Sequence, residues 1–263
     1  MQPKVSVVVP SWFKKEGHDG RYGRQETFYI ASECLNRFIE VTPKELYQLI
    51  LIDNGSDLID DDINNDNIRF KPSWYWEQAD ILIKNKKNLG YGPACNQGIA
   101  VATGEYILNM NNDIVCWDGF VEELLDVFNQ LLTPPVGMAM PALEKSGIRF
   151  PEIMNVKKED IDMKTNAGQY GSKAQFGSAW LMKKSLLDEL FKRDGFYFDP
   201  QFEFLFKEDR DLYERVYQLG YMSYRTHNIR VKHIGNLTVS KFENHHEISA
   251  VNRERFNKKW NIK

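Results

Sequence analysis

The sequence has little cysteine, no long apolar segment and no excess of positive charge, and each shortage excludes a class of protein. Its three cysteines, Cys34, Cys95 and Cys116, form no CxxC pair, which excludes a disulfide scaffold and a cysteine metal site. No stretch approaches the roughly 18 apolar residues that a membrane-spanning helix needs. The N-terminal apolar run of about five residues is too short for a signal peptide. The net charge of −3 gives no general attraction to nucleic acid or acidic membranes. We therefore expect a cytoplasmic protein that associates with membranes, if at all, as a peripheral protein.

What the sequence does contain is enough apolar material for one large domain. Hydrophobic residues make up 42% of the 263 residues and aromatic residues 13%, which predicts a packed core. Strand and helix patterns alternate over the first 140 residues, as in a mostly parallel sheet flanked by helices. The predicted strands cover residues 5–10, 46–56, 79–85 and 105–111, and the predicted helices cover residues 26–40, 92–104 and 117–132.

The second half of the chain is more mixed. Residues 144–174 are polar, rich in lysine and without clear periodicity, which indicates a long loop. Around it we predict strands over 137–143, 176–182, 221–226 and 229–235, and a helix over 207–221 that Gly220 closes. The tail predicts a charged helix over residues 244–260 with four apolar anchors, Ile248, Val251, Phe256 and Trp260.

Two carboxylates stand at the ends of predicted parallel strands. Asp53 ends the second strand and Asp113 follows the fourth. Ligands of open α/β sheets bind beyond these carboxyl ends, so both side chains are candidates for a binding site. The alternative for Asp53 is an ordinary turn, in which the carboxylate caps its own backbone.

A glycine-containing loop opens the helix that follows the third strand. Gly90 and Gly92 bracket Tyr91 there, and small residues let a ligand approach the backbone. The helix N-terminus favours a phosphate group. The spacing matches neither a Rossmann motif nor a P-loop, and a tight turn before a packing helix explains it equally well.

The stretch Asn111-Asn112-Asp113 offers oxygen ligands at a strand end. Such ligands suit Mg²⁺ or Mn²⁺ shared with a substrate diphosphate. One carboxylate is few for a metal, so we expect a second ligand, for which His233 at the end of a later strand is a candidate. A histidine in that position is otherwise more often structural.

Glu208 and Asp209 begin the predicted helix at 207–221. Acidic residues are common there because they stabilise the helix dipole. If this helix start faces the same cleft, either carboxylate is placed to take a proton from an incoming hydroxyl.

These segments together resemble family 2 glycosyltransferases. The similarity rests on "VSVVVPSW", "LILIDNGS", "NKKNLGYGPACNQGIAVATGEYILNMNND", "FGSAWLMKKSLL", "GFYFDPQFEFLFKEDRDLYERVYQLGY" and "VKHIGNLT", which occur in the family's order. The resemblance implies an α/β fold of GT-A type, with a mostly parallel central sheet flanked by helices. It implies one domain over residues 1–243, with a nucleotide-binding half (1–113) and an acceptor-binding half (114–243), followed by a C-terminal helix (244–263).

The resemblance also implies roles by position. The chain is expected to be an inverting hexosyl- or pentosyltransferase that uses a nucleoside-diphosphate sugar and Mn²⁺ or Mg²⁺. Asp209 is the expected general base, with Glu208 beside it, and Asp113 is the expected metal ligand, helped by His233 and Asn111. The expected nucleotide-sugar residues are Pro10, Asp53, Asn88, Gly90, Tyr91, Gly92 and Asn112. The expected acceptor-side or sugar-side residues belong to the segment 176–179 and its neighbour, namely Gly177, Ser178 and Trp180.

The sequence departs from the family pattern in three places. Asn111 stands where the family has the first acid of its DxD motif, the loop after Pro10 is long and basic, and residues 72–78 carry an aromatic patch with Trp74 and Trp76. A glycan is the expected acceptor. A nucleic acid is the alternative, because the aromatic patch and the basic segments 13–24 and 252–263 suit stacking and phosphate contact. A non-catalytic module that binds sugar nucleotides and a sugar nucleotidyltransferase are two competing hypotheses for the whole chain.

Overall fold

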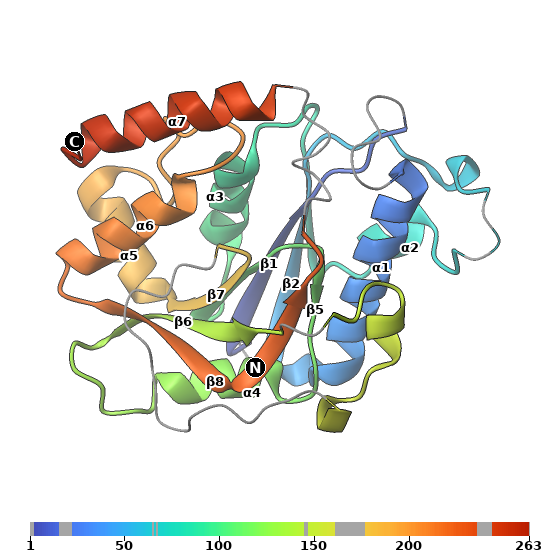
Figure 1. The fold of residues 1–263 in the computed structure, drawn as a ribbon, viewed down its shortest axis with the longest axis horizontal. Coiled ribbons are helices and arrows are strands. Elements are labelled where there is room, and N and C mark those ends of the chain that lie inside the picture. The colour runs from blue at the N-terminus through green and yellow to red at the C-terminus, as the bar shows by residue number, and fades with distance from the viewer. Residues whose placement is uncertain are drawn as a thin grey trace.

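The computed structural model of the chain describes residues 3–15, 23–64, 66, 68–144, 147–160, 177–235 and 244–262. Within these residues, eight strands form a sheet in the order β3-β2-β1-β4-β7-β6-β8-β5 (Figure 1). The strands are β1 (Val5–Ser11), β2 (Tyr47–Asp53), β3 (Ile81–Lys84), β4 (Tyr106–Met110), β5 (Ile114–Val115), β6 (Val136–Leu143), β7 (Ala179–Lys183) and β8 (Met222–His233). The helices are α1 (Arg24–Val41), α2 (Pro72–Glu77), α3 (Tyr91–Val101), α4 (Phe120–Val127), α5 (Lys184–Asp194), α6 (Glu208–Gln218) and α7 (His245–Lys259).

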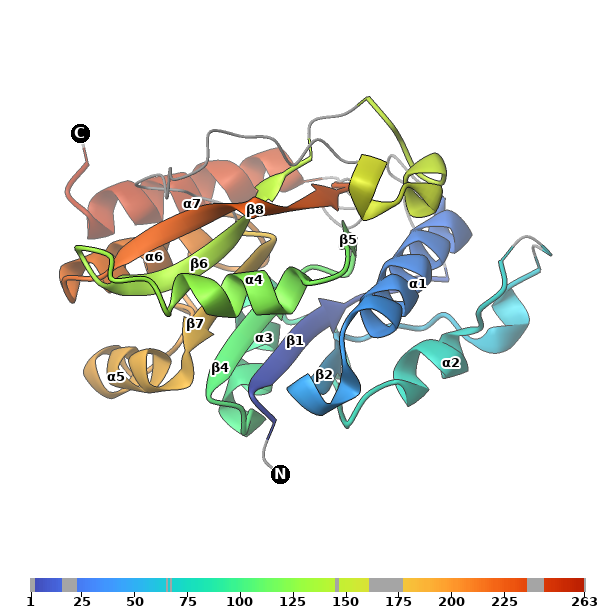
Figure 2. The same cartoon turned by 90° about the horizontal axis from the view of Figure 1, so that it is seen from below.

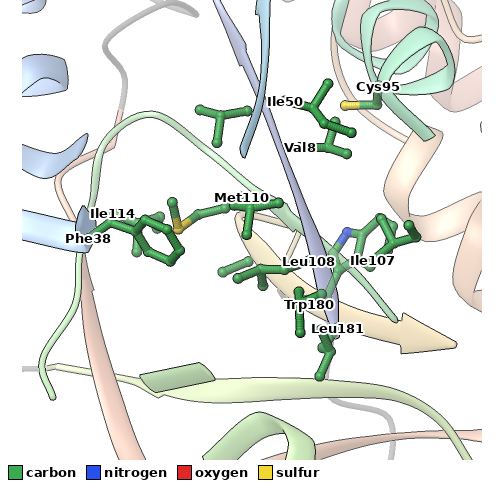
Figure 3. Close-up of a cluster of buried hydrophobic side chains, with 14 of the residues drawn as sticks. Val8, Phe38, Ile50, Cys95, Ile107, Leu108, Met110, Ile114, Trp180 and Leu181 are labelled. Atoms are coloured by element: carbon green, nitrogen blue, oxygen red, sulfur yellow. The ribbon is translucent and has the colours of Figure 1, made fainter. Parts of the chain in front are cut away.

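The first half of the chain forms the parallel part of the sheet. Strand β1 lies between β2 and β4 and is parallel to both, and β3 extends the sheet beyond β2. In Figure 1, α1 and α2 lie to the right of β1 and β2, and α3 lies to the left. A strand covered on both faces buries successive side chains, which explains the uninterrupted apolar run of β1. Figure 3 shows part of this core, with Val8, Ile50 and Leu108 among the buried side chains.

The second half of the chain curls the sheet back toward its beginning. Strand β7 is antiparallel to β4 and to β6, and β8 runs parallel to β6, with α4 packed against both (Figure 2). The short strand β5 follows β4 closely in the chain but pairs with β8 at the far edge, Ile114 opposite His233. This pairing brings the residues after β4 next to the end of β8.

The predicted α/β fold with a mostly parallel sheet and a C-terminal helix is confirmed, but several predicted boundaries are wrong. Helix α3 ends at Val101, and Gly104 does not cap it: a Cβ atom on Gly104 would lie 2.5 Å from the backbone nitrogen of Ser6. Close packing against β1 explains this glycine. Helix α4 is shorter than predicted, and the two strands predicted over 221–235 are the single strand β8, with a bulge between Thr226 and Arg230.

The C-terminal helix α7 does not pack as its apolar residues suggest. Phe256 is buried as expected, but Val251 is 46% exposed and the polar Asn252 is only 1% exposed. Within the described residues, no helix combines the length and apolarity that crossing a membrane requires.

Candidate active site

A cavity of about 690 Å³ opens at the carboxyl ends of β1, β2 and β4. Most of the residues predicted for the site line it, although they come from segments far apart in the sequence. These predicted lining residues are Pro10, Asn88, Gly90, Tyr91, Asn111, Asn112, Asp113, Gly177, Ser178, Glu208, Asp209 and His233. The fold therefore gathers the strand ends, the loop before α3 and the start of α6 around one space.

Asp113 and His233 face each other at the base of this cavity. The Oδ1 atom of Asp113 lies 3.2 Å from Nε2 of His233, and its Oδ2 atom accepts a hydrogen bond from the backbone nitrogen of Gly235 at 2.9 Å. The other ring nitrogen of His233 is 3.1 Å from the hydroxyl of Ser178. Burial opposes protonation of the imidazole, but the adjacent carboxylate outweighs it and raises the pKa of His233. The pairing of β5 with β8 explains how these distant residues meet.

The side chain of Asn111 is held from below by Tyr91. The Tyr91 hydroxyl donates to Oδ1 of Asn111 at 2.8 Å and accepts from the amide of the buried Asn109 at 2.7 Å. Asn112 reaches the other way and donates to the hydroxyl of Ser11 at 3.3 Å. Burial raises the pKa of Tyr91 well above its ordinary value, which keeps the hydroxyl protonated and able to donate.

Asn54 organises the loop before α3, a role that the sequence did not reveal. Its amide nitrogen donates to Oδ1 of Asn88 at 2.9 Å and to the carbonyl of Gly90 at 3.2 Å. Its amide oxygen accepts from the backbone of Leu89 at 3.1 Å. The neighbouring Asp53 instead accepts from the backbone of Ser56 at 2.8 Å, as in an ordinary turn. The signal was present in the Asp-Asn-Gly-Ser turn, but Asn54, and not Asp53, lines the cavity.

Glu208 and Asp209 stand at the start of α6 in different surroundings. Glu208 is buried, and its Oε2 atom has no hydrogen-bond partner among the described residues. Burial and the neighbouring Asp209 raise the pKa of Glu208 well above its ordinary value. Asp209 remains partly exposed along the cavity. Burial also raises the pKa of Asp209.

Gly177 makes room for Asp209. A Cβ atom on Gly177 would lie 2.3 Å from Oδ2 of Asp209, so any side chain at this position would displace the carboxylate. Residue 176, predicted to belong to the same segment, lies outside the described residues, as do residues 16–22 of the long basic loop.

The segment that leads into α6 has an unusual backbone. Three of the four residues 204–207 have positive φ although none of them is glycine: Phe204 at +58°, Phe206 at +70° and Lys207 at +78°. The amide of Asn252 in α7 donates to three carbonyls of this segment, those of Glu203, Leu205 and Phe206, at 2.9, 2.7 and 3.3 Å. The C-terminal helix thus fixes the segment that presents the two acids.

Three predicted site residues do not line the cavity. Asp53 caps its own turn, Gly92 lies behind the wall beside Phe198, and Trp180 is fully buried in the core. Trp180 sits on β7 opposite Asn109, and its ring lies beside that of Phe198 with the centroids 5.9 Å apart. Its large apolar ring is accounted for by packing.

The aromatic patch at 72–78 also has a packing explanation. It forms α2, in which Tyr75 is fully buried and Trp74 stacks on Phe70 with ring centroids 3.8 Å apart. Trp76 leans on Phe13 at 5.6 Å. These contacts remove the main support for a base-stacking surface.

The model of the family described as "Glycosyl transferase family 2" matches residues 22–191, which is more than half of the chain. The chain belongs to glycosyl transferase family 2. The family match covers the loop before α3, the Asn111-Asn112-Asp113 stretch and β7, and it stops before α6.

Individual relatives agree with membership of this family. A poly(ribitol-phosphate) beta-glucosyltransferase of Bacillus spizizenii is 29% identical over 111 residues, which are 42% of this chain and 15% of that protein. The chain therefore spans only a small part of that relative.

Solved glycosyltransferases share the fold at low sequence identity. S. aureus TarS 1–349 in complex with UDP-GlcNAc is 14% identical with a TM-score of 0.55, covering 93% of this chain and 64% of that one. GalNAc-T7 with UDP, GalNAc and Mn²⁺ is 17% identical with a TM-score of 0.59, covering 89% and 44%. The GT-A type of fold and the family expected from the sequence are confirmed.

Proposed function

We propose that the chain is an inverting glycosyltransferase that moves a sugar from a nucleoside diphosphate to a hydroxyl of an anionic glycan. The observation that carries the proposal is the cavity that the Asp113–His233 pair and Asp209 share. The nucleotide-sugar donors in the solved relatives and the polyol-phosphate substrate in the name of the Bacillus spizizenii relative support the donor and acceptor classes.

The first half of the chain supplies the donor side in this proposal. Pro10, Asn54 and the loop from Asn88 to Gly90 would hold the nucleotide, and Tyr91 would keep Asn111 and the wall in place. Residues from the second half, including Asp209, would face the acceptor. This division corresponds to the nucleotide-binding half (1–113) and the acceptor-binding half (114–243) expected from the sequence.

The side chains of Asp113 and His233 fit as ligands of a divalent cation that a substrate diphosphate would share. Asp113 Oδ1 and His233 Nε2 are close enough to bind one ion together, and the contacts to Gly235 and Ser178 fix both groups. Among the described residues, no three histidine, cysteine or acidic side chains gather. Substrate phosphates and water would complete the coordination, as is common for Mg²⁺. A bound cation would offset charge on the leaving diphosphate.

Asp209 is the proposed base. It would take the proton of the acceptor hydroxyl while that oxygen bonds to the anomeric carbon. The bond from this carbon to the diphosphate breaks, and the diphosphate keeps the electron pair. Attack from the opposite face inverts the configuration. A carboxylate with a raised pKa is better matched to this proton transfer at neutral pH than an ordinary aspartate.

Asp209→Asn tests this role. We expect transfer to fall by at least about 10²-fold, because a missing general base costs about that much, while donor binding is retained. Release of nucleoside diphosphate, measured beside donor titration, separates an enzyme from a mere binding module. Asp126→Asn, on the exposed face of α4, is the control. Near-normal turnover in Asp209→Asn would exclude this residue as the base.

The pH profile gives a second reading of the same assignment. Because the base must be ionised, activity should fall as pH decreases through the raised pKa of Asp209, above the ordinary value of 3.8. An acidic limb at or below the ordinary aspartate range would contradict the assignment.

A further inference from the structure

A basic cluster on β8 is not used by the mechanism above. It consists of Arg225, His227 and Arg230, which follow one another along the strand that ends at His233. All three side chains are partly buried. Within the described part of the chain, the Nε atoms of both arginines and Nδ1 of the histidine are buried without a hydrogen-bond partner.

No carboxylate of the described residues neutralises the two arginines. Among the ion pairs that these residues form, none includes Arg225 or Arg230. One nitrogen of Arg230 donates to the carbonyl of Leu143 at 2.9 Å, which fixes the side chain without cancelling its charge. Burial and the charges of Arg230 and Arg225 lower the pKa of His227, so the cations lie close enough to repel another positive charge.

The bulge in β8 keeps the two arginines on one face. Arg225 is opposite Met140 of β6, and Arg230 is opposite Ala142, two residues further on. Alternate residues of a strand point to the same face, so both arginines share that face although five residues separate them. The register shift between Pro141 and Ala142 makes this possible.

None of the three residues lines the cavity, but Met140 connects Arg225 to the helix that forms one of its walls. The hydroxyl of Tyr213 in α6 lies 3.5 Å from the sulfur of Met140, and Tyr213 lines the cavity one helical turn from Asp209. Arg225 is therefore a neighbour, across Met140, of the wall on which the proposed base stands. Arg230 lies three residues from His233, about 10 Å along the strand, and this odd spacing places the two side chains on opposite faces of β8.

We propose that Arg225, His227 and Arg230 form an anion subsite outside the cavity that binds a backbone phosphodiester of the acceptor. The inference rests on the proposed function and extends it to the acceptor. Arginine is suited to the task, since its planar group stays charged and can bind a phosphate through two nitrogens. Unpartnered nitrogens on a cationic, partly buried surface match an anionic ligand and not a neutral glycan.

The test compares binding of labelled oligomers to the whole protein by fluorescence anisotropy. The probes are a synthetic ribitol-phosphate octamer, a neutral sugar oligomer and an oligodeoxynucleotide of equal charge. We expect the ribitol-phosphate octamer to bind most tightly. Its dissociation constant should rise at least tenfold in Arg225→Gln/Arg230→Gln.

Arg253→Gln/Lys192→Gln is the matched control, because both side chains are exposed and the same charge is removed. It should bind the octamer as the wild type does. An equal loss in the control, an unchanged constant in the β8 variant, tighter binding of the oligodeoxynucleotide, or no octamer binding by the wild type would each overturn the subsite.

Donor titration and slow hydrolysis of the nucleotide sugar are measured on the same variants. They should stay within twofold of the wild type, because the subsite does not contact the donor. If the octamer result fails while hydrolysis persists, the subsite is wrong and the glycosyltransferase proposal stands. If hydrolysis is absent from the wild type as well, the proposed function itself is wrong.

Discussion

The two walls of the cavity hold positive φ angles in different ways. On the donor wall, which contains Asn54 and the loop from Asn88 to Gly90, these angles fall on glycines, Gly55 at +83° and Gly90 at +90°. On the acid wall, which consists of the segment 204–207 and the two acids that follow it, the positive angles fall on Phe204, Phe206 and Lys207. These residues have side chains and resist this conformation. The donor wall is therefore relaxed, whereas the acid wall stores strain of about 1–3 kcal/mol per residue.

The hydrogen bonds that hold the two walls also differ: those of the donor wall come from a nearby strand, and those of the acid wall come from the last helix. Asn54 holds the donor loop from the strand next to it, within the family-matched region. The acid segment is held by Asn252 from α7, and α7 is tied to α6 because Trp260 donates to the buried Asp211 at 3.0 Å. A strained backbone persists only where its surroundings determine it, so the last helix is part of the acid wall.

The largest effect should come from Gly90→Ala. The backbone of Gly90 has φ +90° and ψ 168°, and a Cβ atom would lie 2.7 Å from the backbone of Phe204. We expect a loss of at least about 3 kcal/mol in the free energy of unfolding, measured by urea denaturation, and weaker donor binding. Gly23→Ala is the control, since its φ is −59° and no atom lies within 4 Å of the new Cβ. Equal effects of the two substitutions would erase the glycine-based half of the comparison.

Asn252→Ala should separate the walls. The substitution removes the side-chain amide that donates hydrogen bonds to three carbonyls, and it should lower the free energy of unfolding by about 2 kcal/mol. The acid segment loses its support, so kcat should fall about tenfold or more, while the donor dissociation constant stays within twofold. Glu254→Ala, on the exposed face of α7, should change neither. Equal losses of donor affinity and kcat would show that α7 supports the whole domain and not the acid wall alone.

The same contrast explains what the sequence could predict. The donor wall is built from local signals, such as apolar runs ending in Asp, Asn and Gly, and these placed β1, β2, β4 and the cavity correctly. The sequence singled out Asp53 and gave no sign of Asn54, because both residues fit a turn and the difference depends on which one faces the loop at Asn88.

The acid wall depends on contacts that no local pattern encodes. Asn252 is a polar residue inside a charged helix, where exposure is the default expectation, and Val251 beside it was one of the four predicted anchors. Phe204 and Phe206 read as ordinary apolar residues, because a positive φ on a residue with a side chain leaves no mark in the sequence. Trp180 was assigned to the site by its neighbours Gly177 and Ser178, whereas its ring is buried in the core beside Phe198.

The smallest effect tests the strain itself at Lys207, the residue before the two acids. Lys207→Gly and Lys207→Ala both remove the positive charge that lowers the pKa of Glu208 and Asp209, but only glycine accepts a φ of +78° without strain. The glycine variant should therefore be more stable than the alanine variant by about 1 kcal/mol in urea denaturation. In the pH–activity profiles of both variants, the acidic limb should move to higher pH by a similar amount, because both substitutions remove the same charge. If the alanine variant proved as stable as the glycine variant, the acid wall would not be strained at Lys207. The hydrogen bonds from Asn252 would then not be needed to keep this residue in its conformation.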